Sequence, residues 1–129
     1  MHINCGGKQA TIGSIKYDGD EASGGGAKFF YDTGNWGFSS TGDFGLMNYD
    51  QEYIARNSFI LNMTNSELYS TARISPLSLT YYARCLANGN YTVKLHFAEI
   101  VIRNNRPYYG VGRRIFDVYI QVVILLCSP

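Results

Sequence analysis

The clearest alternation of apolar and polar positions in the chain lies in residues 89–100. Tyr91, Val93, Leu95 and Phe97 alternate with polar or small residues, which is the two-residue period of a strand with one face in a core and the other in water. We therefore expect a central antiparallel strand here, with these four side chains buried. Replacing Phe97 with alanine should then cost about 3–5 kcal/mol of stability.

Similar patterns predict further strands. Residues 79–86 precede an Asn-Gly-Asn turn and are expected to pair with residues 91–100 as a hairpin. Residues 114–121 alternate again, and the apolar run 122–127 is expected to continue that strand. Shorter strands are expected at residues 1–5, 12–17 and 67–74, whereas residues 52–57 are either a helical turn or a strand.

Residues 19–45 contain eight of the fourteen glycines, together with Asp, Ser and Asn, and are therefore expected to form a long loop. The segments Phe29-Phe30-Tyr31 and Trp36-Gly37-Phe38 lie within it. A merely flexible linker would not carry so many rings, so they either hold the loop against the fold or face a ligand.

A chain of 129 residues is long enough for one domain with its own core. It contains no pattern for an amphipathic helix of three turns. The predicted architecture is therefore all-β, a β-sandwich or jelly roll. A final apolar strand that ends without a turn suggests a sandwich that is incomplete at its C-terminus and leaves an open edge.

A formal charge of +1 and a pI near 7.7 give no extended positive field, which argues against nucleic acid as a partner. No signal peptide or transmembrane helix is apparent, although the glycosylation sequons at Asn62 and Asn90 favour a secreted parent. Cys5 and Cys85 either form a long-range disulfide or remain free, and Cys127 lies in the C-terminal tail.

Nothing in the sequence indicates an enzyme, a cofactor or a metal site. The acidic stretch 18–21 lacks the further ligands of a calcium loop and is read as a solvated turn. A glycosidase would need Glu99 and Asp117 to share a cleft, and their spacing does not establish one.

A binding surface is better supported, because sugars present an apolar ring face and a rim of hydroxyl groups. Flat aromatic rings beside amide or carboxylate groups would recognise both. The alternative is that these rings pack their own loops. The candidate ligand-binding residues are Trp36, Phe44, Tyr69, Asn104, Tyr108 and Tyr109.

Several segments, taken in order, resemble the plant malectin domain of leucine-rich-repeat receptor-like serine/threonine kinases. They include Ile3-Asn4-Cys5-Gly6-Gly7, Ile15-Lys16-Tyr17-Asp18-Gly19-Asp20, Asn35-Trp36-Gly37, Leu68-Tyr69-Ser70-Thr71-Ala72-Arg73, Leu95-His96-Phe97-Ala98-Glu99-Ile100 and Arg114-Ile115-Phe116-Asp117-Val118. The resemblance covers residues 2–121, a partial malectin domain, and leaves 122–129 as an apolar tail outside the family.

This resemblance implies a jelly-roll-like β-sandwich of the carbohydrate-binding-module type and a non-catalytic role. The expected ligand is a cell-wall or glycan carbohydrate, or a protein or peptide. The domain would lie on the extracellular side of the plasma membrane in a receptor ectodomain, beside leucine-rich repeats, and a full-length parent would add a membrane span and a kinase domain. The alternatives are a structural or protein-interaction module without sugar binding, and a lectin of the endoplasmic reticulum lumen.

Animal malectin binds glucose-capped N-glycans through loop aromatics and a late Asp. At the corresponding positions this chain keeps one ring, Phe44, and has Ile74, Val101 and Ile102 at the others. The position of the late Asp falls beyond residue 129. The loss of these rings removes the stacking platform, so the resemblance argues against binding of glucose oligomers in the manner of animal malectin.

Overall fold

The computed structural model describes residues 1–22, 25, 27–31, 34–44, 53–57, 63–100, 114–121 and 123–125. In these residues the strands are β1 (Ile3–Cys5), β2 (Ala10–Ile12), β3 (Ile15–Asp20), β4 (Ala27–Tyr31), β5 (Trp36–Thr41), β6 (Ile54–Arg56), β7 (Thr71–Arg73), β8 (Ser78–Ala83), β9 (Val118–Ile120) and β10 (Val123–Leu125). The one helical element of the described part is a 3₁₀ turn, η1 (Ser66–Tyr69). The all-β class is confirmed.

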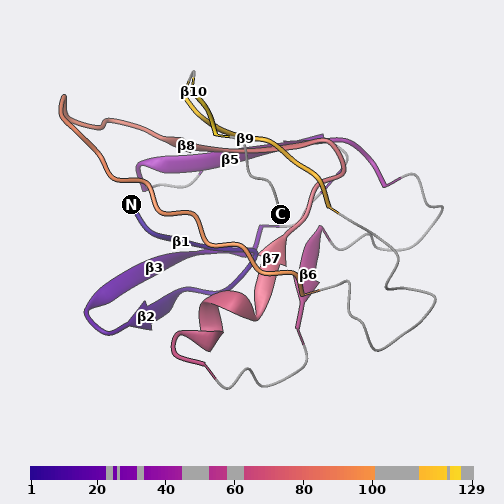
Figure 1. The fold of residues 1–129 in the computed structure, drawn as a ribbon, viewed down its shortest axis with the longest axis horizontal. Coiled ribbons are helices and arrows are strands. Elements are labelled where there is room, and N and C mark those ends of the chain that lie inside the picture. Colours follow the sequence, from indigo (N-terminus) through magenta and orange to yellow (C-terminus); the bar gives the residue numbers. More distant parts are fainter. Residues whose placement is uncertain are drawn as a thin grey trace.

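The strands form four small sheets, in the orders β1-β3-β2, β4-β5-β8, β6-β7 and β10-β9. Only β1 and β3 pair in parallel, and the other described pairs are antiparallel. Figure 1 shows β5 and β8 above the layer that contains β1 and β3, with β6 and β7 at one end. The described strands do not show the jelly roll that the sequence predicted.

The stretch expected to be a long loop contains the best-formed hairpin of the structure. β4 pairs with β5 over five residues on each side, from Ala27↔Thr41 to Tyr31↔Gly37. Its sequence hides the strand period because rings occupy both faces of β4, so no apolar–polar alternation is visible. The loop prediction is therefore wrong for residues 27–31 and 36–41.

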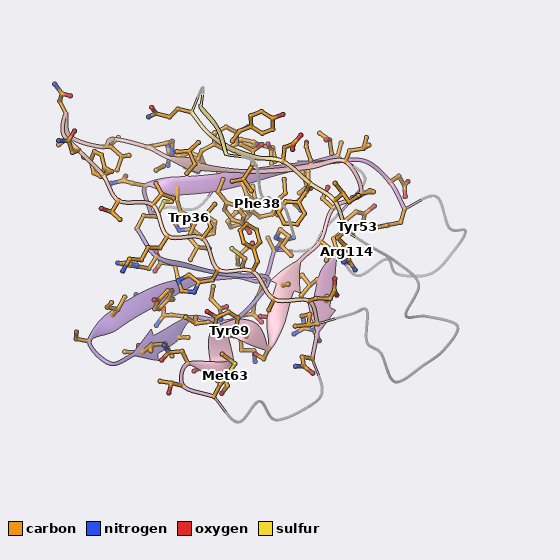
Figure 2. All side chains as sticks on the ribbon, viewed as in Figure 1. Trp36, Phe38, Tyr53, Met63, Tyr69 and Arg114 are labelled. Carbon is orange, nitrogen blue, oxygen red and sulfur yellow. The ribbon has the colours of Figure 1, made fainter. Side chains whose placement is uncertain are left out.

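One face of β5 forms the core. Trp36 is 2% exposed and Phe38 is 0% exposed, and both point into the space between the two layers (Figure 2). Phe30 of β4 stacks on Phe38 with ring centroids 5.4 Å apart, and Tyr81 of β8 lies 5.9 Å from Phe38 on the other side. The small sheet thus contributes a continuous row of rings to the interior.

The predicted central strand is not a strand in the structure. Residues 90–100 have no regular secondary structure, and Tyr91, Val93, Leu95 and Phe97 are 50–56% exposed. The burial assigned to these four side chains is therefore wrong. Alternation indicates that a segment can be a strand, but it does not supply the neighbour that would cover it.

The expected hairpin with residues 79–86 is also absent, because β8 pairs with β5 instead. Beyond β8, the main-chain N–H of Arg84 donates to the carbonyl of Asn35 at 2.7 Å, and Cys85 takes a positive φ of 55°. These contacts hold the chain against the β4–β5 hairpin, and it does not fold back along β8.

Three other predictions change in detail. Residues 12–17 are not one strand, because Gly13, at φ 61°, turns β2 into β3. Residues 67–74 comprise the end of η1 followed by β7. Within the expected run 122–127, residues 123–125 do not continue the preceding strand, because Gln121 takes φ 57° and β10 returns antiparallel to β9, with Val123 opposite Ile120.

Candidate functional site

The most prominent open surface is the side of the β4–β5–β8 sheet opposite Trp36 and Phe38. Side chains alternate along a strand, so the residues between the buried ones point outward. Phe29 and Tyr31 of β4 and Tyr82 of β8 are 68%, 56% and 42% exposed. We call this surface the outer aromatic face; its outward positions are Ala27, Phe29, Tyr31, Gly37, Ser39, Thr41, Ser78, Thr80 and Tyr82.

The central strand of this face carries only small side chains. Gly37 lies between Tyr31 and Tyr82 in the register, and Ser39 lies between Phe29 and Thr80. The ring centroids of Phe29 and Tyr82 therefore approach to 6.4 Å across β5. Gly37 also has no room for a side chain, because a Cβ there would meet the Phe30 carbonyl oxygen at 2.7 Å.

Hydroxyl groups accompany the rings. Ser39 Oγ and Tyr82 Oη share a hydrogen bond of 2.9 Å, and Thr41 Oγ1 and Ser78 Oγ share one of 2.6 Å. None of the outward positions of these three strands holds a charged residue. The surface is thus neutral, aromatic and hydroxylated.

One cation borders the face. The guanidinium carbon of Arg84 lies 3.7 Å from the centroid of the Tyr31 ring, and Nη1 donates a hydrogen bond to the Tyr31 hydroxyl. Arg84 Nη2 also donates to the Gly34 carbonyl at 3.2 Å. A guanidinium on an aromatic ring is a favourable cation–π arrangement and fixes the orientation of the ring.

Beneath the face, a buried polar cluster anchors β8. Tyr81, the neighbour of Tyr82, donates its hydroxyl proton to Asp20 Oδ2 at 2.6 Å. Burial, and then the nearby Cys5 and Asp20, raise the pKa of Tyr81 far above its ordinary value, so it stays neutral. Asp20 is 0% exposed and binds Arg73, so the reading of residues 18–21 as a solvated turn is wrong at Asp20.

A second candidate site is an open depression of about 530 Å³ that is lined in part by residues 97–100. Its lining includes the Tyr69 and Phe97 side chains together with Asn57 and Glu99. Tyr69 Oη is hydrogen-bonded to His96 Nδ1 at 2.6 Å, and Glu99 accepts a hydrogen bond from Arg114 Nε at 2.8 Å. Two polar lining residues, Tyr69 and Glu99, are thus hydrogen-bonded to residues outside the lining.

The structure separates the residues that the sequence proposed as one binding set. Trp36 is in the core, where its ring is not available to a ligand. Phe44 is 37% exposed and packs on Tyr53, with ring centroids 5.3 Å apart. Tyr69 lines the depression. Asn104, Tyr108 and Tyr109 lie outside the described residues.

Sequence reasoning missed the outer aromatic face. Phe29 and Tyr31 were visible as rings, but only their position on a strand shows that they share a side and that Phe30 points the other way. Tyr82 joins them from β8, about fifty residues later, through a pairing that the alternation did not reveal. The one available signal in the sequence was the two-residue spacing of Phe29 and Tyr31, because two residues is the period of a strand.

Other sequence predictions can be placed as well. Cys5 and Cys85 are free thiols, so the disulfide considered for them is not formed in the structure. Asn90 is exposed, whereas Asn62 and Cys127 lie outside the described residues. Glu99 lines the depression, whereas Asp117 is not among the described residues that line it.

In the described part of the chain, no three His, Cys, Asp or Glu side chains come together as metal ligands. The same residues include no helix that is long and apolar enough to cross a membrane.

Comparison with known proteins gives one family. Residues 1–126 match the malectin domain. The chain is 47% identical over 127 residues to the probable LRR receptor-like serine/threonine-protein kinase RFK1 of Arabidopsis thaliana, with 94% of the chain covered. It is 46% identical over 131 residues to the probable LRR receptor-like kinase At1g29720 of the same plant, with 98% covered.

The chain spans only 12% and 13% of the length of these two relatives. No solved structure matches significantly. The sequence similarity therefore identifies the domain, and the structure adds where its side chains lie. This chain belongs to the malectin domain family.

Proposed function

We propose that this chain is a non-catalytic carbohydrate-recognition domain that binds a neutral glycan on its outer aromatic face. The observation that carries the proposal is the grouping of Phe29, Tyr31 and Tyr82 on one open side of a three-stranded sheet. Membership of the malectin family supports carbohydrate as the ligand class.

The chemistry of the face suits a sugar. The apolar C–H side of a pyranose ring stacks on an aromatic ring, while its hydroxyl groups need hydrogen-bond partners at the rim. Phe29 and Tyr82 supply the rings, and Ser39 supplies a hydroxyl between them that already bonds to Tyr82. A sheet holds such groups more rigidly than loops do, which reduces the entropy lost on binding.

The lack of charge at the outward positions favours an uncharged ligand over a polyanion. Among the described residues that border the face, the cation available to an acidic polymer is Arg84, whose guanidinium is engaged by Tyr31 and Gly34. Neutral cell-wall oligosaccharides and glucose-capped N-glycans are therefore the ligands to examine first.

The relatives extend this proposal to the whole protein. Because they are named LRR receptor-like kinases, we propose that the domain serves in a receptor ectodomain on the extracellular side of the plasma membrane, next to leucine-rich repeats. Kinase activity would belong to other parts of such a receptor.

A protein-interaction role without sugar binding is the second candidate. Two observations favour it: Trp36, the most obvious stacking ring in the sequence, is in the core, and exposed tyrosines are also frequent in protein interfaces. Under this alternative the same face would bind a protein or peptide surface.

Isothermal titration of neutral oligosaccharides into the chain tests the proposal. Tyr82→Ala and Phe29→Ala should each weaken binding about tenfold, which corresponds to about 1.4 kcal/mol. Tyr119→Ala is the matched control, because Tyr119 is a 61% exposed ring on β9, outside the face, and should bind normally. Loss of binding in Tyr69→Ala but not in Tyr82→Ala would move the site to the depression. A chain that binds no glycan but binds a receptor fragment would favour the interaction role.

A further inference from the structure

The chain contains an acceptor motif for N-linked glycosylation that the proposed sugar site does not use. Asn90-Tyr91-Thr92 follows the pattern Asn-X-Thr, with a residue other than proline in the middle. A motif of this kind carries a sugar chain in the folded protein only where the asparagine has room for a bulky group. The surroundings of Asn90 in the fold therefore decide whether the motif is usable.

Asn90 lies in the exposed connection that follows β8. Asn90 and Thr92 belong to no strand or helix, and every residue from 85 to 99 is exposed. A Cβ placed on the preceding Gly89 would meet no atom within 4 Å. Figure 1 shows this part of the chain at a tip beyond β8 (orange). The folded domain thus has room for a large group at Asn90.

Two hydrogen bonds order the chain around the acceptor. The main-chain N–H of Arg84 donates to the Asn35 carbonyl at 2.7 Å, which ties the start of the connection to the residue before β5. The Tyr91 hydroxyl donates to the Ala87 carbonyl, which closes the tip. Neither bond involves the Asn90 side chain, so both can persist when a sugar is attached to its amide nitrogen.

We propose that Asn90 carries an N-linked oligosaccharide. The sugar chain comes from a lipid-linked diphosphate donor. The bond between C1 of its first sugar and Asn90 Nδ2 forms as the bond between C1 and the diphosphate oxygen breaks. The amide loses one proton, and the lipid diphosphate leaves. Thr92 provides the hydroxyl group that defines the acceptor, two residues beyond the asparagine.

The donor and its transferase belong to the secretory pathway, so this inference rests on the extracellular placement proposed above. It does not depend on sugar binding by the outer aromatic face, because Asn90 lies outside β4, β5 and β8.

The glycan has a physical role at this position, because apolar side chains follow it. Tyr91, Val93 and Leu95 are 55%, 51% and 50% exposed. Exposed apolar groups favour association between molecules, and a bulky hydrophilic glycan opposes it. An extended chain spans at most about 3.6 Å per residue, so the Cα atom of Val93 lies at most about 11 Å from that of Asn90. A branched oligosaccharide on Asn90 thus reaches the solvent beside these side chains and keeps the tip soluble.

Expression of the full chain behind a cleavable secretion signal in cultured human cells tests the modification. The signal brings the chain to the transferase whatever its natural location. The variant Asn62→Gln serves as the background, because it removes the other sequon. The intact mass should then show one oligosaccharide, which peptide N-glycosidase releases, leaving aspartate at position 90 in the peptide map. Translation into microsomes gives the same mass shift if little chain is secreted.

Substitutions in the motif give the controls. In this background Asn90→Gln and Thr92→Ala should lose the oligosaccharide, whereas Thr92→Ser should keep it. Asn88→Gln is the matched control and should keep it too, because Asn88 is exposed in the same turn but has no hydroxyl residue two positions later. A chain without sugar on Asn90, or an oligosaccharide that persists in Asn90→Gln, would overturn the proposal.

Light scattering over a concentration series tests the role of the glycan. Asn90→Gln should aggregate at a lower concentration than Asn88→Gln, and equal behaviour would overturn the solvating role. Trp36 fluorescence checks that both variants are folded, since this side chain is buried in the core. Absence of the glycan would leave sugar binding by the outer aromatic face untouched, whereas a glycosylated chain that binds no oligosaccharide would contradict only that binding.

Discussion

Arg73 of β7 holds Asp20 at the end of β3 through two nearly parallel hydrogen bonds, Nε to Oδ2 at 2.6 Å and Nη2 to Oδ1 at 2.7 Å. Both side chains are buried, and Tyr81 and the Gly6 amide also donate to Asp20 Oδ2. The Arg73 guanidinium further lies 4.2 Å from the centroid of the Phe38 ring. One carboxylate thereby connects β3, β7, β8 and the turn that follows β1, which links the two layers of the fold.

Removing the charge of Asp20 should be costly. Asp20→Asn keeps the shape but leaves Arg73 as a buried cation without its counterion, which typically costs about 3–5 kcal/mol. Urea unfolding should show this loss in the free energy of unfolding. Asp18→Asn is the control: Asp18 faces Lys16 at 4.0 Å on the surface, so its removal should cost at most about 1 kcal/mol. Equal losses in the two variants would contradict the role of the cluster.

The same cluster predicts a sensitivity to alkaline pH. Burial raises the pKa of the Cys5 thiol above 9.0, although the residue is partly open to solvent, and burial also raises the pKa of Tyr81 above 10.0. The unfolded chain therefore releases these protons at lower pH than the folded chain does. The contribution of these two groups to the free energy of unfolding should therefore be fully present below about pH 9 and should be lost progressively above it.

Thermal melts between neutral pH and pH 11 measure this effect. Cys5→Ala should remove the part of the decline that begins near the ordinary thiol pKa, and tyrosinate absorbance from Tyr81 should appear only with unfolding. A melting midpoint that is flat to pH 11 would show that neither group is held protonated by the fold.

The structure reverses an expectation about Phe97. Because Phe97 is 56% exposed, Phe97→Ala should change the stability of the monomer by less than about 1 kcal/mol. Phe38→Ala should cost about 3–5 kcal/mol, since Phe38 is 0% exposed and packed among rings. Chemical denaturation of the two variants compares these losses, and a larger loss for Phe97→Ala would restore the central-strand hypothesis.

Gly37 should resist substitution. A Cβ on Gly37 would meet the Phe30 carbonyl oxygen at 2.7 Å, so Gly37→Ala requires a shift of the β4–β5 pair and should cost about 1–3 kcal/mol. Gly25→Ala, where nothing lies within 4 Å, should be nearly neutral. Chemical denaturation measures the free energy of unfolding of both variants. No loss in Gly37→Ala would mean that the β4–β5 pair adjusts freely to the added methyl group.

The sequence was sufficient to predict the β class, the first strand and most of β8. These features depend on local signals: alternation in residues 79–83, and the glycines after β1, of which Gly6 takes a positive φ of 73°. Local period and turn chemistry act within a few residues, so they can be read without knowing the partners.

The partners themselves were not predictable in this way. The alternation in residues 91–100 does not say whether any strand lies beside it, and the rings on both faces of β4 concealed a real strand. Asp20 looked like part of a solvated turn because its counterion, Arg73, is fifty-three residues away. The candidate site depended on such distant pairings, since Tyr82 meets Phe29 only through β5.

Aromatic-ring NMR during an oligosaccharide titration tests the central claim most directly. The ring resonances of Phe29, Tyr31 and Tyr82 should shift with a common saturation curve, whereas the indole signal of Trp36, which faces the core, should hardly move. Shifts confined to Tyr69 and Phe97, or no shift with any neutral oligosaccharide, would contradict glycan binding on the outer aromatic face.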